Sequence, residues 1–276
     1  MIGRGRVALI GHPVSHSLSP AMQNAALDAA GIALRYEALD VEPSGLASAL
    51  AAMREVNGAG NLTIPHKIKG MALMQKLTPT ALRAGAVNTF WVDAEGELAG
   101  DNTDVLAFTE LVLETLGEIP TGARVAVLGA GGAAAAVVTA LETWPGASAT
   151  VHARDLSRAV AVRMRHSVVV RACSMRDPCL ADATIVVNAT PLGLAAADPL
   201  PVELDRLHPG AVVFDLVYGR GGTRLVREAH ERGHAASDGL VMLLHQGAAA
   251  FHRMFGIDPD VSVMRQELER QSFNGG

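Results

Sequence analysis

The stretch from Arg124 to Glu142, RVAVLGAGGAAAAVVTALE, constrains the fold more than any other part of the sequence. A short apolar run, Val125 to Leu128, stops at a glycine, and an alanine-rich segment follows at once, which predicts a strand, a tight turn and a helix. Gly129, Gly131 and Ala134 match the G-x-G-x-x-G/A spacing, in which the two glycines permit the turn and the approach of a pyrophosphate. A glycine triplet alone is also typical of an ordinary turn. Strand, turn and helix in this order favour a dinucleotide site, with phosphates on the N–H groups at the helix start.

Length and composition favour a globular enzyme of two domains. The 276 residues suffice for two cores, and 49% hydrophobic against 18% charged residues is an ordinary globular composition. The formal net charge of -5 argues against a nucleic-acid partner, because nucleic-acid binding usually needs a basic face. A small-molecule substrate fits this composition better.

The sequence also predicts a cytoplasmic location. No apolar run approaches the roughly 18 residues that span a bilayer, and Met1 to Gly11 lacks a signal-peptide cleavage pattern. Cys173 and Cys179, the only cysteines, match no zinc or redox motif. So few thiols indicate a reducing compartment, where we expect both to be buried and inert.

The first hundred residues alternate strands and helices. We expect a strand at Arg6 to Ile10, a second at Leu34 to Leu39, a helix from about Ser44 to Val56, and a further strand near Asn61. Strand, helix and strand in succession predict a parallel α/β sheet that precedes the dinucleotide segment.

The loop HPVSHSLSP offers two serines beside a helix start. Ser19 followed by Pro20 is typical of an N-cap and a first helical residue, which explains Ser19 without any function. Ser17 has no such explanation, and a hydroxyl beside a helix N-terminus can bind a carboxylate. His12 and His16 are four residues apart, but they precede the helix and lack a third ligand, so we expect no metal site.

Polar side chains follow two later elements. Asn61 and Thr63 alternate with apolar residues at the end of the expected strand, where open α/β sheets bind ligands, and Lys67 lies just beyond. Asp104 begins a helix that ends at Gly117. Taken alone, the lysine is typical of a solvated surface and the aspartate of a first-turn carboxylate facing the helix dipole.

Together these segments resemble the shikimate dehydrogenase family. The resemblance covers the chain from about Val7 to Phe255, in the family's order and at its spacing. The motifs are SLSP from Ser17, NLTIPHK from Asn61, AVNT from Ala86, GDNTD from Gly100, GAGGA from Gly129, NATPLG from Asn188, DLVY from Asp215 and QGAAAF from Gln246.

The resemblance implies a role for each matching residue. Lys67 and Asp104 correspond to the family's catalytic pair, and Ser17 and Ser19 to the serines that hold the substrate carboxylate. The residues that complete the implied substrate site are Asn61, Thr63, Asn88, Tyr218 and Gln246. Those that the resemblance places at the cofactor are Gly129, Ala130, Gly131, Gly132, Ala133, Arg154, Arg158, Thr190, Leu216 and Gly239.

The implied chemistry suits these side chains. Reduction of a ketone by NADPH needs a proton at the carbonyl oxygen as hydride reaches carbon, and a lysine ammonium held by a carboxylate can supply it. Asn61 and Asn88 offer donors and acceptors, as a ring bearing hydroxyls requires. No metal is needed.

The residues after the next strand bear on the choice between NADP and NAD. We expect that strand at Ala149 to Ala153, followed by Arg154 and, one helical turn later, Arg158. Guanidinium groups favour a 2′-phosphate, whereas an NAD site places an acid there for the ribose hydroxyls. The family's NADP form has an Asn-Arg-Thr turn; here Ala153 replaces the asparagine and Asp155 the threonine, so NAD remains possible. Two arginines on a solvated helix are the alternative without function.

The later elements complete a two-domain α/β fold. We expect strands at Ala183 to Asn188 and Ala211 to Val217, a flexible Gly219 to Gly222 turn, and helices at Leu240 to Phe255 and Asp258 to Phe273. Residues 1–104 and 238–276 then form an N-terminal α/β substrate-binding domain completed by the C-terminal helices, and residues 105–237 an NADP-binding Rossmann domain.

The sequence therefore predicts NADPH-dependent reversible reduction of 3-dehydroshikimate to shikimate, a step of aromatic amino-acid biosynthesis. The alternatives are an NAD-using quinate/shikimate or aminoshikimate dehydrogenase and, in a different class, a nucleotide-binding regulator without catalysis. Retention of both Lys67 and Asp104 argues against the regulator. The protein is expected to be a monomer or a homodimer.

Overall fold

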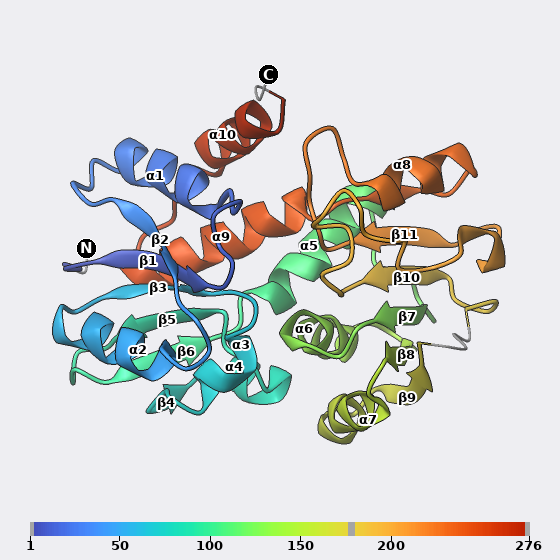
Figure 1. The fold of residues 1–276 in the computed structure, drawn as a ribbon, viewed down its shortest axis with the longest axis horizontal. Helices are drawn as coiled ribbons and strands as arrows, with labels where there is room; N and C mark the ends of the chain where they lie inside the picture. The colour runs from blue at the N-terminus through green and yellow to red at the C-terminus, as the bar shows by residue number, and fades with distance from the viewer. Residues whose placement is uncertain (1–2, 176–179, 274–276) are drawn as a thin grey trace. The chain divides into compact units, whose positions relative to one another are not determined.

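A computed structural model describes residues 3–175 and 180–273 of the chain. The chain divides into two compact units, the first comprising Met1–Asp104 with Leu243–Gly276 and the second Val105–Met242. Each unit is built on its own six-stranded sheet (Figure 1). Cys179 lies outside the described residues, while Cys173 is buried as expected.

The first unit contains a mixed sheet in the order β2-β1-β3-β5-β6-β4. β1 pairs in parallel with β2 and β3, as the strand-helix-strand alternation predicts, but β5 is antiparallel to both of its neighbours. The expected strands are therefore parallel as predicted, but the parallel pairing does not extend to β5, and a tight turn at Gly96 (φ 77°) accounts for the antiparallel pairing of β5 with β6. The strands are β1 (Val7–Gly11), β2 (Tyr36–Asp40), β3 (Ala59–Leu62), β4 (Lys76–Leu77), β5 (Thr89–Val92) and β6 (Leu98–Asp101).

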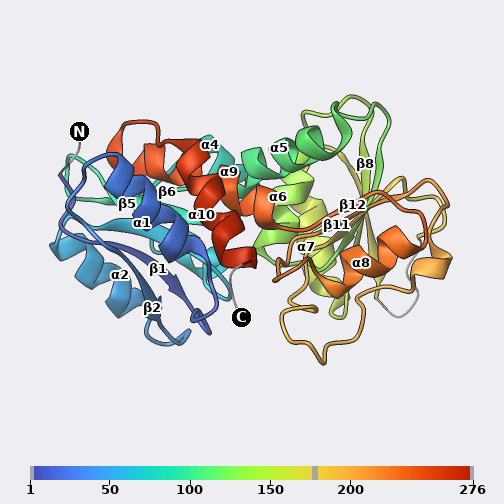
Figure 2. The same ribbon diagram turned by 90° about the horizontal axis from the view of Figure 1, so that it is seen from above.

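Helices cover both faces of this sheet. On one face, α1, α9 and α10 pack against β1 through residues such as Met22, Phe251 and Met264, and Figure 2 shows α1 and α10 side by side. On the other face, α2 and α4 contribute Leu50 and Ala81 to a second cluster. The helices are α1 (Ser19–Ala29), α2 (Leu46–Glu55), α3 (Lys67–Met71), α4 (Pro79–Ala84), α9 (Leu240–Phe255) and α10 (Val261–Phe273).

The second unit is a parallel sheet in the order β12-β11-β10-β7-β8-β9. Numbered within the unit, this is the 3-2-1-4-5-6 order of a Rossmann fold, whose strand order reverses between β7 and β10. The predicted α/β fold is confirmed. Its strands are β7 (Arg124–Leu128), β8 (Ser148–Ala153), β9 (Val169–Ser174), β10 (Ile185–Asn188), β11 (Val212–Asp215) and β12 (Ala236–Ser237). Its helices are α5 (Asp104–Leu116), α6 (Gly132–Leu141), α7 (Leu156–Arg165), the short 3-10 helix Leu204–Arg206 and α8 (Arg224–Glu231).

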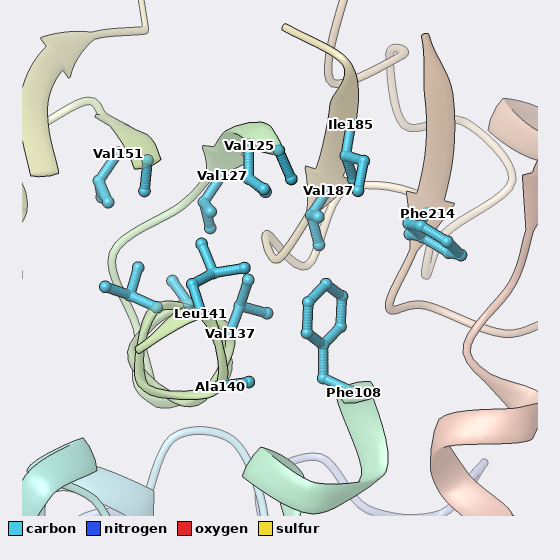
Figure 3. Packing of buried hydrophobic residues seen from close by; sticks show 14 of the residues in the cluster. Phe108, Val125, Val127, Val137, Ala140, Leu141, Val151, Ile185, Val187 and Phe214 are labelled. Atoms are coloured by element: carbon cyan, nitrogen blue, oxygen red, sulfur yellow. The ribbon is translucent and has the colours of Figure 1, made fainter. Parts of the chain in front are cut away.

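The Rossmann core is apolar and closely packed. Val125, Val127 and Val187 of the central strands meet Val137 and Leu141 of α6 (Figure 3). The Phe108 ring of α5 stacks on the indole ring of Trp144, with ring centroids 5.7 Å apart, and meets the Phe214 ring edge-on. This apolar layer fixes the strand ends on which the glycine turn stands. None of the helices in residues 3–175 and 180–273 is long and apolar enough to cross a membrane.

Candidate active site and cofactor site

Lys67 and Asp104 form a close ion pair within the first unit. Lys67 is the first residue of α3 and Asp104 the first of α5, so two helix starts bring them together. The Lys67 Nζ donates to Asp104 Oδ2 at 2.6 Å, and the side chains are 17% and 4% exposed. The N-terminal end of α5 favours a carboxylate at this position. An ammonium group is thereby fixed at a partly open place, with its counter-charge buried behind it.

Asn88 holds the other oxygen of that carboxylate. Its Nδ2 donates to Asp104 Oδ1 at 2.8 Å and contacts Thr103 Oγ1 at 3.0 Å, while its Oδ1 accepts from the Thr103 backbone N–H at 2.8 Å. Asn88 itself is 1% exposed. Both carboxylate oxygens of Asp104 therefore have donors, and the orientation of the group is determined from two sides.

Asn61 is also part of this network, in a supporting place. Its Nδ2 donates to Asn88 O at 3.1 Å and to Thr89 Oγ1 at 3.0 Å, and its Oδ1 accepts from the Tyr36 hydroxyl at 2.7 Å. Both amide hydrogens are thus engaged within the protein, which leaves only acceptor capacity on Oδ1. Burial raises the pKa of Tyr36 and keeps its hydroxyl protonated as a donor. Sequence reasoning missed Tyr36 because an aromatic residue in a strand is typical of plain core packing.

The serines correct one expectation. α1 begins at Ser19, but the residue before it, Leu18, occupies the N-cap with helical dihedrals, and no side chain caps the helix. The predicted N-cap role of Ser19 is therefore wrong. Ser17 Oγ instead accepts the Ser19 backbone N–H at 3.2 Å, so the residue that lacked a structural explanation has one. Ser19 is buried at 6% exposure and Ser17 is half-buried.

Thr63 and Gln246 stand on other elements of the same unit. β3 ends at Leu62, so Thr63 is the first residue after the strand. A Cβ at Gly11 would lie only 2.3 Å from the side-chain methyl of Thr63. Glycine at position 11 is therefore needed for this approach. Gln246 lies on α9, and its Nε2 donates to the Leu243 carbonyl at 2.9 Å.

The two histidines of the first loop do not meet. His12 Nδ1 lies 2.5 Å from Asp40 Oδ1, and His16 Nδ1 lies 3.3 Å from Ser15 Oγ. The described part of the chain holds no cluster of three or more His, Cys, Asp or Glu side chains able to bind a metal.

In the second unit, the glycine turn follows β7 as its spacing predicts. Gly129 has φ +113°, and a Cβ there would lie 2.7 Å from the Ala189 carbonyl oxygen, so only glycine fits where this turn passes the end of β10. Gly131 occupies the N-cap of α6, and a Cβ there would meet nothing within 4 Å. The helical bonds of α6 begin with Ala135 N donating to Gly131 O, and the N–H groups before it have no acceptor one turn back in the helix. Open space and amide donors at this helix start fit a phosphate group.

Arginines flank an acidic cap beside this turn. Arg154 and Arg158 are both exposed, the first just beyond β8 and the second in the first turn of α7. Asp155 lies between them and is the N-cap of α7, because its Oδ1 accepts from Ser157 N at 3.0 Å and Ser157 Oγ at 2.6 Å. These bonds lower the pKa of Asp155. Its charge is therefore directed at the helix start.

The remaining cofactor candidates lie at the carboxyl ends of β10 and β11. Thr190 donates from its N and Oγ1 to Asn188 Oδ1, at 3.1 and 2.6 Å. Gly239 packs so closely on Leu216 that a Cβ would lie 2.5 Å from the Leu216 carbonyl oxygen. Tyr218 is half-buried, three residues beyond the end of β11.

A buried Asn-Asp pair supports these strand ends and was not singled out by sequence reasoning. Asn188 Nδ2 donates to Asp215 Oδ1 at 2.8 Å, and the same oxygen accepts from Val217 N at 3.1 Å. Burial raises the pKa of Asp215. Both residues are inside the NATPLG and DLVY motifs, so the motif positions were the available signal.

Comparison with known proteins identifies the family. The family model for the shikimate dehydrogenase substrate binding domain matches residues 9–90, and that for the shikimate 5′-dehydrogenase C-terminal domain matches residues 239–269. The shikimate dehydrogenase (NADP(+)) of Rubrobacter xylanophilus is 44% identical over 269 residues, covering 95% of this chain and 94% of the relative. The chain belongs to the shikimate dehydrogenase family. The resemblance inferred from the sequence motifs is confirmed.

Solved structures of the family agree with this fold. The shikimate 5-dehydrogenase of Thermus thermophilus, in complex with NADP(H) and shikimate, is 36% identical with a TM-score of 0.83, over 96% of this chain and 99% of that one. The quinate dehydrogenase of Corynebacterium glutamicum, in complex with NAD, is 32% identical with a TM-score of 0.84, over 95% and 98%. The same fold therefore serves both cofactors and two related substrates.

Proposed function

We propose that this chain is an NADP-dependent shikimate dehydrogenase that interconverts 3-dehydroshikimate and shikimate. The observation that carries the proposal is the Lys67–Asp104–Asn88 arrangement, in which one ammonium group is aimed by a buried carboxylate. The first unit holds the substrate, and the second holds the cofactor at the glycine turn and the two arginines. Two cysteines in a chain of this length support a reducing cytoplasm as its location.

The proposed chemistry places the proton on Lys67. NADPH supplies the hydride when bound. As negative charge develops on the substrate carbonyl oxygen, the Lys67 ammonium donates its hydrogen bond and then its proton to that oxygen. Asp104 keeps the ammonium in place and stabilises its charge before transfer. In the reverse direction the neutral amine accepts the proton of the alcohol.

Asn88 and the serines orient the ring in this proposal. Hydrogen bonds to Thr103 and Asp104 fix the orientation of the Asn88 side chain, so that a substrate hydroxyl that contacts this amide is held in one position. Ser17 and Ser19 receive the substrate carboxylate near the start of α1, where backbone N–H groups add to the hydroxyls. Thr63 and Gln246 complete the substrate contacts of this unit.

A second candidate, an NAD-using quinate/shikimate dehydrogenase, is favoured by one observation. Asp155 follows the arginine at the end of β8, where an acidic side chain usually marks an NAD site. Steady-state assays with shikimate and quinate, each with NADP and NAD, distinguish the candidates. We expect kcat/KM to be highest for shikimate with NADP. A preference for quinate with NAD would establish the second candidate, and no turnover with any combination would revive the nucleotide-binding regulator.

A further inference from the structure

A buried carboxylate outside the proposed catalytic set joins three separate elements of the first unit. Asp101 ends β6 and is 4% exposed. Its Oδ1 accepts from the Asn102 backbone N–H at 2.7 Å and from the Thr78 hydroxyl at the start of α4. Its Oδ2 accepts from Arg253 Nε at 2.8 Å, and Arg253 lies on α9. One side chain therefore ties β6, α4 and α9 together.

This carboxylate lies beside the residues that hold the proposed catalytic pair. Asp101 is three residues before Asp104, and the backbone carbonyl of Asp101 accepts the Asn88 N–H at 3.1 Å. The next residue, Asn102, donates from its side chain to the Ala86 carbonyl at 2.9 Å. The backbone that presents both Asn88 and Asp104 is thus anchored at Asp101.

The partner of this carboxylate is on the helix that carries Gln246. Arg253 is seven residues after Gln246, which is two helical turns, so both lie on about the same face of α9. Phe251 and Phe255 pack α9 into the apolar cluster of this unit. Two hydrogen bonds also hold α9, from Gln23 Nε2 to the Gly247 carbonyl at 2.9 Å and from Arg4 Nε to the Met254 carbonyl at 2.8 Å. The ion pair supplies a directional contact between α9 and β6.

We propose that Asp101 and Arg253 are positioning residues, whose ion pair fixes Gln246 relative to Asp104 and Asn88 and so shapes the substrate site. The proposal rests on the function proposed above. The pair touches neither substrate nor reacting atoms in this scheme. Its effect appears as substrate affinity and turnover, because a substrate held by Gln246 on one side must meet the Lys67 ammonium on the other.

The test uses Arg253→Gln and Arg253→Lys in the full-length protein. We expect Arg253→Gln to raise the KM for shikimate about tenfold and to lower kcat several-fold, with the KM for NADP within twofold of wild type. Arg253→Lys restores much of the loss because an ammonium can still pair with the carboxylate. Arg270→Gln is the matched control, since it breaks an exposed ion pair to Glu267 on α10 and leaves kinetics unchanged.

Stability is separated from positioning by a second control. Leu50→Ala destabilises the same unit from the opposite face of the sheet and should leave both kinetic constants unchanged at 25 °C, where the variant remains folded by circular dichroism. If Arg253→Gln behaves like Leu50→Ala, lowering the melting temperature with wild-type KM and kcat, the pair is structural and the proposal is overturned. Equal losses of shikimate and NADP affinity would overturn it as well.

A readout independent of catalysis distinguishes failure of this proposal from failure of the proposed function. Wild-type turnover of shikimate tests the function. Hydrogen exchange in the ligand-free protein tests the anchor: the amides of Asn88 and of Asn102 to Asp104 should exchange at least tenfold faster in Arg253→Gln than in Arg270→Gln. Equal exchange in the two variants would refute the anchor whether or not the enzyme turns over shikimate.

Discussion

Replacing Tyr36 by Phe removes one oxygen atom from the hydrogen-bond network of the first unit. That hydroxyl donates at 2.7 Å to Asn61 Oδ1, and both residues are buried, at 3% and 4% exposure. A buried acceptor left without its donor costs about 1–3 kcal/mol. In a unit of this size each kcal/mol lowers the melting temperature by roughly 2–4 °C. We therefore expect a drop of about 2–12 °C.

The same substitution should also reduce activity. Without the Tyr36 hydroxyl, Asn61 Oδ1 loses its donor while the two Nδ2 bonds remain, so the Asn61 amide is held less firmly against the Asn88 carbonyl. We expect kcat/KM for shikimate to fall about tenfold, equivalent to about 1.4 kcal/mol of transition-state stabilisation. Because burial raises the pKa of Tyr36, its hydroxyl stays a donor throughout, and the wild-type to variant ratio should be constant from about pH 6 to pH 9.

A matched control isolates the effect of losing the Tyr36 hydroxyl. Ser272→Ala removes another buried hydroxyl of the first unit, one that donates to the Leu268 carbonyl on α10, and should leave kcat/KM unchanged. Steady-state kinetics and thermal melts of both variants give the comparison. If Tyr36→Phe loses stability as expected but keeps kcat/KM within twofold of wild type, then Asn61 does not depend on Tyr36 for its orientation, and the reasoning fails.

Other substitutions test the proton donor, the serines, the cofactor arginines and a buried histidine. Lys67→Ala should lower kcat roughly 10²- to 10⁴-fold with a smaller change in KM. The double variant with Asp104→Ala should have a kcat only slightly lower than that of Lys67→Ala, because the two residues act as a unit. If Lys67→Ala raises KM and leaves kcat intact, the lysine is a binding residue. Ser17→Ala should cost roughly 1 kcal/mol in thermal melts and weaken shikimate binding in calorimetry, and loss of stability alone would assign it a structural role. Arg154→Ala should raise the KM for NADP about tenfold with little change for NAD, whereas equal losses would contradict a 2′-phosphate contact. Burial lowers the pKa of His152 to about 4, so between pH 7 and pH 5 this side chain is protonated in the unfolded chain but not in the folded one, and the free energy of unfolding falls by roughly 2 kcal/mol. Urea unfolding of His152→Gln should lack this pH-dependent loss of stability. If the variant loses as much stability between pH 7 and pH 5 as the wild type does, His152 is not its source.

Local sequence patterns were sufficient to predict most helices and strands, but not the side-chain contacts between them. The Rossmann strand, turn and helix at Gly129 followed from spacing and periodicity, because each of those features is encoded within a few residues. The pairing of Lys67 with Asp104 joins positions 37 residues apart, and only the family resemblance brought them together in advance. The Tyr36 contact with Asn61 carries no local signal at all.

The errors have physical causes of the same kind. Ser19 before Pro20 is a common start for a helix, yet the backbone at Leu18 already has helical dihedrals, so the first turn begins one residue earlier than the pattern indicates. A buried antiparallel strand and a buried parallel strand have similar apolar patterns, which is why the direction of β5 was not predictable. Both errors concern geometry that tertiary packing decides.

Residues of opposite charge follow β8, and they favour different cofactors: Asp155 favours NAD, whereas Arg154 and Arg158 favour NADP. An acidic residue selects NAD by accepting hydrogen bonds from the ribose hydroxyls. Asp155 Oδ1 accepts two hydrogen bonds from Ser157, and the N-terminal end of α7 stabilises the negative charge there. The guanidinium groups of Arg154 and Arg158 belong to exposed residues and can meet a phosphate without first being uncovered. The helix-capping role of Asp155 explains an acidic residue at this position. The basic side chains of Arg154 and Arg158 favour NADP.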